Sequence, residues 1–113
     1  EGFLAAREIL AGPASRRPTA IIAQSDLLAA GAVRAAEDLG IRVPEDLSVT
    51  GFDGVVVDGL APYELTTLVQ PAVEKGRAAG RAVAAMLEDR PPPVVTFTCE
   101  FREGNTTAEP PRG

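Results

Sequence analysis

The fold of this chain is constrained above all by two strand-like apolar runs. Each run leads into an acidic turn, and a helical pattern separates the two. The first run covers residues 19–24 and is followed by Ser25 and Asp26. The second run covers residues 47–52 and is followed by Asp53. A strand, a helix and a strand in series favour a parallel pair with a right-handed crossover, so both acidic turns are expected at one edge of a sheet. Ligands of open α/β sheets bind at that edge, and the pattern therefore predicts a small-molecule pocket.

The rest of the chain continues this alternation of helices and strands. Apolar residues at helical spacing predict helices over residues 2–11, 26–39 and 71–89. A short extended piece is predicted at 65–69 and an alternating, half-buried strand at 94–101. The order predicts an α/β fold, with a three-layer parallel sheet and helices on both faces. Three convincing strands make a small sheet, so we expect the chain to be part of a larger domain.

Two finer expectations concern packing. The helix predicted over 71–89 has an apolar stripe that includes Gly76 and Gly80, and these small residues indicate close approach to a sheet or to another helix. The polar segment 102–113 is expected to fray at the end of the domain.

Composition excludes several classes of function. The 113 residues include no histidine and one cysteine, which removes Ser-His-Asp and Cys-His nucleophile systems, histidine metal sites and an intrachain disulfide. Glycine-rich phosphate loops and a nucleophile elbow are also missing from the sequence. Asp26 and Asp53 could in principle act as an acid and base pair, but nothing else in the sequence supports an enzyme. The net charge of −5 gives no basic footprint, so DNA contact is expected elsewhere in the protein.

The residues at the strand ends can be given roles in binding. An ionised Asp53 accepts two hydroxyl hydrogen bonds, as a vicinal diol requires, and Phe52 can pack an apolar ring or a sugar face. Ser25 and Asp26 stand at a helix N-terminus, where backbone N–H groups are free. Gln70 can both donate and accept. Simpler alternatives remain open: helix capping for Ser25, Asp26 and Gln70, and an ordinary Asp-Gly turn at Asp53.

Several segments, in the same order, resemble the effector domain of the LacI/GalR family of bacterial transcription regulators. The segments that carry the resemblance are Pro18 to Ala32, Gly40 to Asp53, Leu65 to Pro71 and Arg102 to Thr107. The resemblance implies a periplasmic-binding-protein-like fold of two α/β subdomains with a ligand in the cleft between them. Residues 1–113 would form part of this one effector-binding domain, most of its C-terminal subdomain, without the N-terminal subdomain and the DNA-binding helix-turn-helix.

The resemblance also implies roles for individual residues. The acid matching Asp53 contacts the effector, usually through sugar hydroxyls, and the positions matching Ser25 and Gln70 line the cleft. Asp26 matches a family aspartate for which shaping of the turn is an alternative to direct contact. Two positions depart from the family: Ser25 stands where asparagine is common and would reach the ligand through water, and Gly54 stands where many members carry a second acid.

The function implied is the ligand-sensing part of a transcription regulator. We expect it to bind a small-molecule effector, a sugar, and to control operator DNA binding by a region outside this chain, within a cytoplasmic homodimer. No enzymatic activity, metal or cofactor is expected. No membrane contact is expected either, because no apolar run approaches the roughly 20 residues that span a bilayer. The alternative is a secreted solute-binding protein of a sugar uptake system, which shares the fold.

Overall fold

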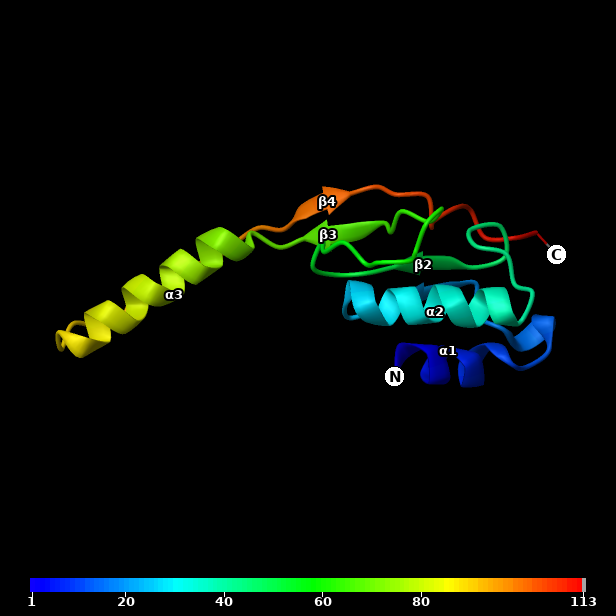
Figure 1. The fold of residues 1–113 in the computed structure, drawn as a ribbon, viewed down its shortest axis with the longest axis horizontal. Helices are drawn as coiled ribbons and strands as arrows, with labels where there is room; N and C mark the ends of the chain where they lie inside the picture. The colour runs from blue at the N-terminus through cyan, green and yellow to red at the C-terminus, as the bar shows by residue number, and fades with distance from the viewer. Residues whose placement is uncertain (113) are drawn as a thin grey trace. The chain divides into compact units, whose positions relative to one another are not determined.

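The computed structural model describes residues 1–112, in which helices and short strands alternate (Figure 1). The elements are α1 (Gly2–Leu10), a 3₁₀ helix (Ala14–Arg16), β1 (Ala20–Ile22), α2 (Asp26–Asp38), β2 (Ser48–Thr50), β3 (Thr67–Val69), α3 (Ala72–Leu87) and β4 (Glu100–Arg102). Two compact units make up the chain: Glu1–Val69 together with the segment from Phe101 onward, and Gln70–Glu100. Among the described residues, no helix has both the length and the apolar content needed to cross a membrane.

The two apolar runs form a parallel pair, as predicted. In the β1–β2 register, Ile21 lies opposite Val49. Parallel bridges from Thr50 to Thr66 and from Asp53 to Val69 continue the pairing towards β3, and β3 pairs in turn with β4. The α/β class and the parallel pairing of β1, β2 and β3 are therefore confirmed, although β1 and β2 are shorter than the predicted runs.

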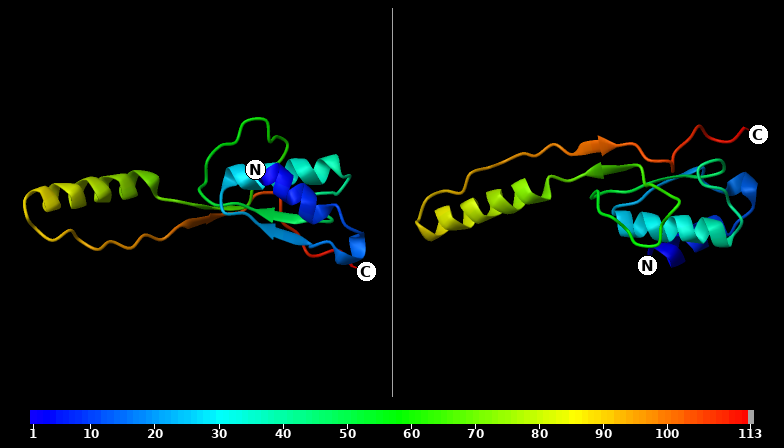
Figure 2. Two further views of the ribbon diagram at one scale, coloured as in Figure 1. Left: turned by 90° about the horizontal axis from the view of Figure 1, so that it is seen from below. Right: turned by 45° about the horizontal axis from the view of Figure 1, so that its top comes forward.

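Helix α2 packs between the strands and α1, and both helices lie on one side of β1 and β2 (Figures 1 and 2). A side-chain carbon at Gly31 would lie 2.6 Å from the backbone nitrogen of Phe3, so only glycine allows this close crossing of α1 and α2. The opposite face of β1 leaves Ile22 85% exposed. We predicted helices on both faces of the sheet. Neither α1 nor α2 covers this second face.

An apolar core joins α1, α2, the strands and the loops that connect them. Because α2 is covered on two sides, by α1 and by the strands, its buried surface is wider than the single stripe that helical spacing predicts. The core residues from these elements include Leu10, Ala29, Val33, Ala36, Ile41, Val43, Leu47, Val49, Leu60 and Leu65.

The close contact expected along α3 is not made by the described residues. Side-chain carbons built at Gly76 and Gly80 meet no atom within 4 Å. Val83 and Leu87, on the predicted apolar stripe, are exposed, whereas Ala85 is buried. Helical periodicity correctly locates the helix and its apolar residues, but it does not specify what those residues pack against.

The predicted strand at 94–101 is largely wrong. Only Glu100–Arg102 pairs as a strand, and Phe101 is exposed rather than half-buried. Alternation of apolar and polar residues is a local signal, whereas a strand also needs a neighbouring strand to receive its hydrogen bonds.

The expectation that residues 102–113 fray is wrong for the segment around Thr106. Thr106 is completely buried, its hydroxyl donates to the Val49 carbonyl at 2.6 Å, and it accepts from the Thr66 backbone N–H at 3.0 Å. The Val49 N–H donates to the Thr106 carbonyl at 2.8 Å. This polar segment is therefore tied to β2 and to the residue preceding β3, in the interior of the unit.

Candidate functional site

The carboxyl end of β1 leads directly into α2, and Ser25 caps that helix. Its backbone is extended, at φ −153° and ψ 160°, and its Oγ accepts a hydrogen bond from the Leu28 N–H at 3.2 Å. The capping role is therefore confirmed. A hydroxyl oxygen that accepts one bond keeps its own proton for donation, so capping leaves the half-buried Ser25 able to donate to a ligand or to water.

Asp26, the first residue of α2, is fully buried. Its Oδ2 accepts from the backbone N–H groups of Gly54 and Val55, both at 2.8 Å, and its Oδ1 accepts from the Thr67 hydroxyl at 2.7 Å. Its own N–H donates to the Phe52 carbonyl at 2.9 Å. Of the two interpretations of Asp26, these contacts support shaping of the turn, because the carboxylate lies inside the protein.

Asp53 follows β2 in an unusual backbone conformation. Its φ is +125°, a region that favours glycine and costs a residue with a side chain about 1–3 kcal/mol. Pairing with the neighbouring strand holds it there, since its N–H donates to the Leu68 carbonyl at 2.9 Å. The next residue, Gly54, also has a positive φ, of +82°, and a side-chain carbon there would lie 2.8 Å from Val69 Cγ1. A strained, half-buried aspartate thus stands at the end of β2.

Two residues that organise this turn were missed by the sequence analysis. Thr67 supplies the hydroxyl that Asp26 binds, and Gly51 makes space for the same carboxylate, because a side-chain carbon at Gly51 would lie 2.2 Å from Asp26 Oδ1. The available signal was weak: a polar threonine within the apolar run 65–69, and a glycine inside a predicted strand, which can mark close approach of another group.

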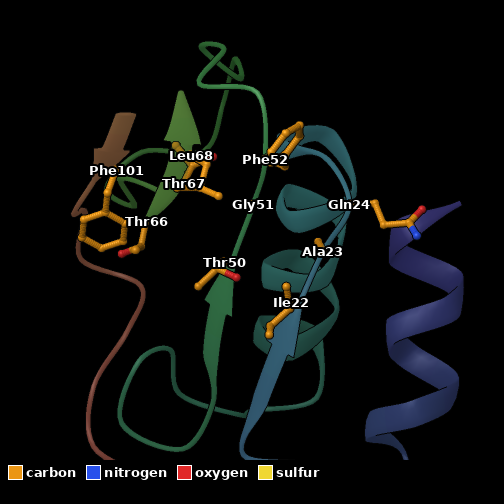
Figure 3. Close-up of a pocket in the computed structure, with 10 residues that line it drawn as sticks. All are labelled: Ile22, Ala23, Gln24, Thr50, Gly51, Phe52, Thr66, Thr67, Leu68 and Phe101. Atoms are coloured by element: carbon orange, nitrogen blue, oxygen red, sulfur yellow. The ribbon is translucent and has the colours of Figure 1, made fainter. Parts of the chain in front are cut away.

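A hollow of about 500 Å³ lies beside the strands (Figure 3). Its lining residues are Ile22, Ala23, Gln24, Thr50, Gly51, Phe52, Thr66, Thr67, Leu68 and Phe101. Of the predicted site residues, only Phe52 is among them, and the lining contains no charged side chain. The lining is largely apolar, its polar side chains are those of Gln24 and the three threonines, and it does not include Ser25 or Asp53. We take the turn that holds Ser25 and Asp53 as the candidate site, because a carboxylate can accept two hydroxyl groups of a ligand.

Gln70 belongs to the second compact unit. Its Oε1 accepts from Lys75 Nζ at 2.5 Å, and its carbonyl accepts from the Ala72 N–H at 2.8 Å. These bonds place Gln70 at the start of α3, where Pro71 is the N-cap residue. Its contact with an effector stays a prediction, as do those of Ser25 and Asp53.

The described residues contain no group of three or more histidine, cysteine, aspartate or glutamate side chains that could hold a metal ion. The clearest electrostatic perturbation lies in the loop that precedes β2. There, hydrogen bonds from Arg42 hold the pKa of Asp46 at about 2, below its ordinary value of 3.8. Asp46 stabilises that loop and forms no part of the turn built by Asp26 and Asp53.

Comparison with known proteins identifies the family. The profile of the periplasmic binding protein-like domain matches residues 3–107. The HTH-type transcriptional regulator YvdE of Bacillus subtilis, itself uncharacterized, is 40% identical over 84 residues, which cover 74% of this chain and 26% of YvdE. The chain thus spans about a quarter of the length of that relative.

Solved structures agree with this assignment. A LacI family transcriptional regulator from Bifidobacterium animalis subsp. lactis is similar to 98% of this chain and 40% of its own, with 29% identity and a TM-score of 0.81. A LacI family regulator from Arthrobacter sp. FB24, in complex with lactose, covers 95% of this chain and 40% of its own, with 29% identity and a TM-score of 0.76. The chain therefore belongs to the family of periplasmic binding protein-like domains, in the form that LacI-type transcription regulators carry.

Proposed function

We propose that this chain is part of the sensor of a LacI-type transcription regulator and that it contributes to a binding site for a sugar effector. The observation that carries the proposal is the position of Asp53, at the carboxyl end of β2 and beside the start of α2, where open α/β sheets bind ligands. Family membership supports a binding role rather than catalysis, and the lactose complex of the Arthrobacter regulator supports a sugar.

The groups at this edge suit a polyhydroxylated ligand. The Asp53 carboxylate can accept from two neighbouring hydroxyl groups of a sugar ring. Ser25, whose hydroxyl keeps a proton to donate, stands at the end of β1. The ring of Phe52 lies at the end of its strand in Figure 3 and offers an apolar surface for the face of a sugar.

In the full-length protein, effector binding would favour one arrangement of the sensor over another and so change operator binding by a homodimer in the cytoplasm. Such coupling is typically about 1–3 kcal/mol and equals the difference in effector affinity between the two arrangements. The net charge of −5 supports DNA contact through a region outside these 113 residues. The names of the relatives favour a regulator over a solute-binding protein of an uptake system.

The test is titration calorimetry of the full-length protein with lactose, maltose, sucrose and glucose. Asp53→Ala should weaken binding of the sugar that the wild type binds by about 10-fold to 100-fold, because bonds to a charged group contribute about 1.5–3 kcal/mol. Asp58→Ala is the matched control, since it removes the same charge from an exposed position in the same loop, and should leave affinity unchanged. Equal affinity of the Asp53→Ala variant and the wild type would refute the role of Asp53, and absence of binding by all four sugars would count against the proposed effector class.

A further inference from the structure

We propose that Asp26 is a positioning residue for the effector site: its carboxylate holds the loop after β2 in the conformation that presents Asp53. The inference rests on the proposed function for its effect on binding. It assigns to Asp26 no contact with the effector, because that side chain is fully buried.

The carboxylate of Asp26 joins three segments that are distant in sequence. Oδ2 receives two successive backbone N–H groups, from Gly54 and Val55, 28 and 29 residues further along the chain. Oδ1 receives the hydroxyl of Thr67, 41 residues away. Both oxygens are therefore occupied, and one side chain connects the start of α2, the loop of residues 53–63 after β2 (the effector loop) and β3.

The part of the effector loop directly after Asp53 depends on these bonds, because the loop is next held by apolar packing only at Val57 and Leu60. Val56 is 92% exposed and Val55 is also exposed, so little apolar burial holds this part of the loop. Asp53 is strained at φ +125°, and the chain would relax towards ordinary angles if the loop were released. The two N–H bonds fix the residues directly after Asp53, while its own N–H is fixed by Leu68. The strained turn is thus fixed on both sides.

Two substitutions at Asp26 separate its geometry from its charge. Asp26→Ala removes the acceptor for the Gly54 and Val55 N–H groups. Asp26→Asn keeps the shape: its oxygen can accept from both N–H groups, and its NH₂ can donate to Thr67, whose hydroxyl can accept as well as donate. A positioning role predicts loss with alanine and rescue with asparagine.

The first measurement is sugar affinity of the full-length protein, with the lactose, maltose, sucrose and glucose panel. If loss of the bonds leaves the loop in the binding arrangement about one tenth of the time, Asp26→Ala weakens binding about 10-fold, because apparent affinity scales with the competent fraction. Asp26→Asn should stay within about 3-fold of the wild type by the same relation. Equal losses for both variants would overturn the positioning role.

A double-mutant cycle distinguishes positioning of Asp53 from general damage. In an Asp53→Ala background, Asp26→Ala should cause no further loss of affinity, since the group that it positions is already gone. Additive losses would show that Asp26 acts independently of Asp53 and would overturn the proposal.

A ligand-independent measurement keeps the test separate from the proposed function. Hydrogen exchange of a peptide covering residues 53–57, measured by mass spectrometry in the full-length protein, should be faster by about 10-fold in Asp26→Ala and near the wild-type rate in Asp26→Asn, because freed amides exchange through local opening. Unchanged exchange in Asp26→Ala would overturn the proposal even if sugar binding is affected. Should none of the sugars bind the wild type, the proposed sugar function fails, and exchange at these amides still decides whether Asp26 holds the loop.

Discussion

Gly51→Ala is the substitution whose effect follows most directly from the structure. The added carbon would lie 2.2 Å from Asp26 Oδ1 and 3.2 Å from its Cα. The first distance is far below van der Waals contact, so the carboxylate must move. Asp26 is fully buried and its Oδ1 is bonded to Thr67 at 2.7 Å, so any movement that relieves the clash breaks that bond.

The size of the effect can be worked from these contacts. Losing a hydrogen bond to a charged buried group costs about 1.5–3 kcal/mol, and overpacking adds about 1–3 kcal/mol. The reduced flexibility of the unfolded chain offsets about 0.4–1 kcal/mol. We therefore expect Gly51→Ala to lower the free energy of unfolding by about 3 kcal/mol, which corresponds to a fall in Tm of about 6–12 °C for a domain of 150–250 residues.

Differential scanning calorimetry of the full-length protein measures this change. Gly12→Ala is the matched control, because a carbon at Gly12 meets no atom within 4 Å, and its Tm should stay within about 2 °C of the wild type. The Gly51→Ala, Asp26→Ala double variant should be less destabilised than the two single variants predict, since removal of the carboxylate removes the clash. A wild-type Tm for Gly51→Ala, or strict additivity in the double variant, would refute the reasoning.

Two further predictions concern residues outside the effector loop. Thr106→Val leaves the buried Thr66 N–H without its acceptor and should lower the free energy of unfolding in urea by about 1–3 kcal/mol. The control Thr96→Val, at an exposed threonine, should have no measurable effect. Equal urea midpoints for the two variants would contradict the structural role of the buried Thr106 hydroxyl. Because Arg42 lowers the pKa of Asp46 from 3.8 to about 2, the stabilisation from this pair is present above pH 4 and is lost as the pH falls towards 2. Asp46→Asn should remove that part of the acid dependence in thermal unfolding curves, and an unchanged pH profile would show that the pair contributes nothing.

Much of the first unit could be predicted from the sequence because the signals are local. Helical spacing and the Ser25 cap located α2 to within one residue, and the two apolar runs located β1 and β2. Absence of histidine excluded whole classes of catalytic and metal sites without any structure. These signals are carried by residues a few positions apart or by composition, which do not depend on how the chain packs.

The predictions that failed all concern which distant segment of the chain a given segment contacts. The run at 94–101 alternates like a strand, but only its end finds a neighbouring strand to pair with. The segment around Thr106 is polar like a frayed terminus, yet its hydroxyl and backbone groups bond to Val49 and Thr66 in the interior. Polarity alone does not distinguish a group that binds water from one that binds the protein.

Local patterns along the chain were enough to predict a helix between two parallel strands, with an aspartate after each strand. Only the tertiary structure separated these two acids, turning Asp26 into the interior and leaving Asp53 at the strained end of β2. The separation depends on Gly54, Val55 and Thr67, which are 28 to 41 residues from Asp26 along the chain. Whether an acid is buried within its own protein is set by which distant donors the fold brings to it, and no local pattern contains that information.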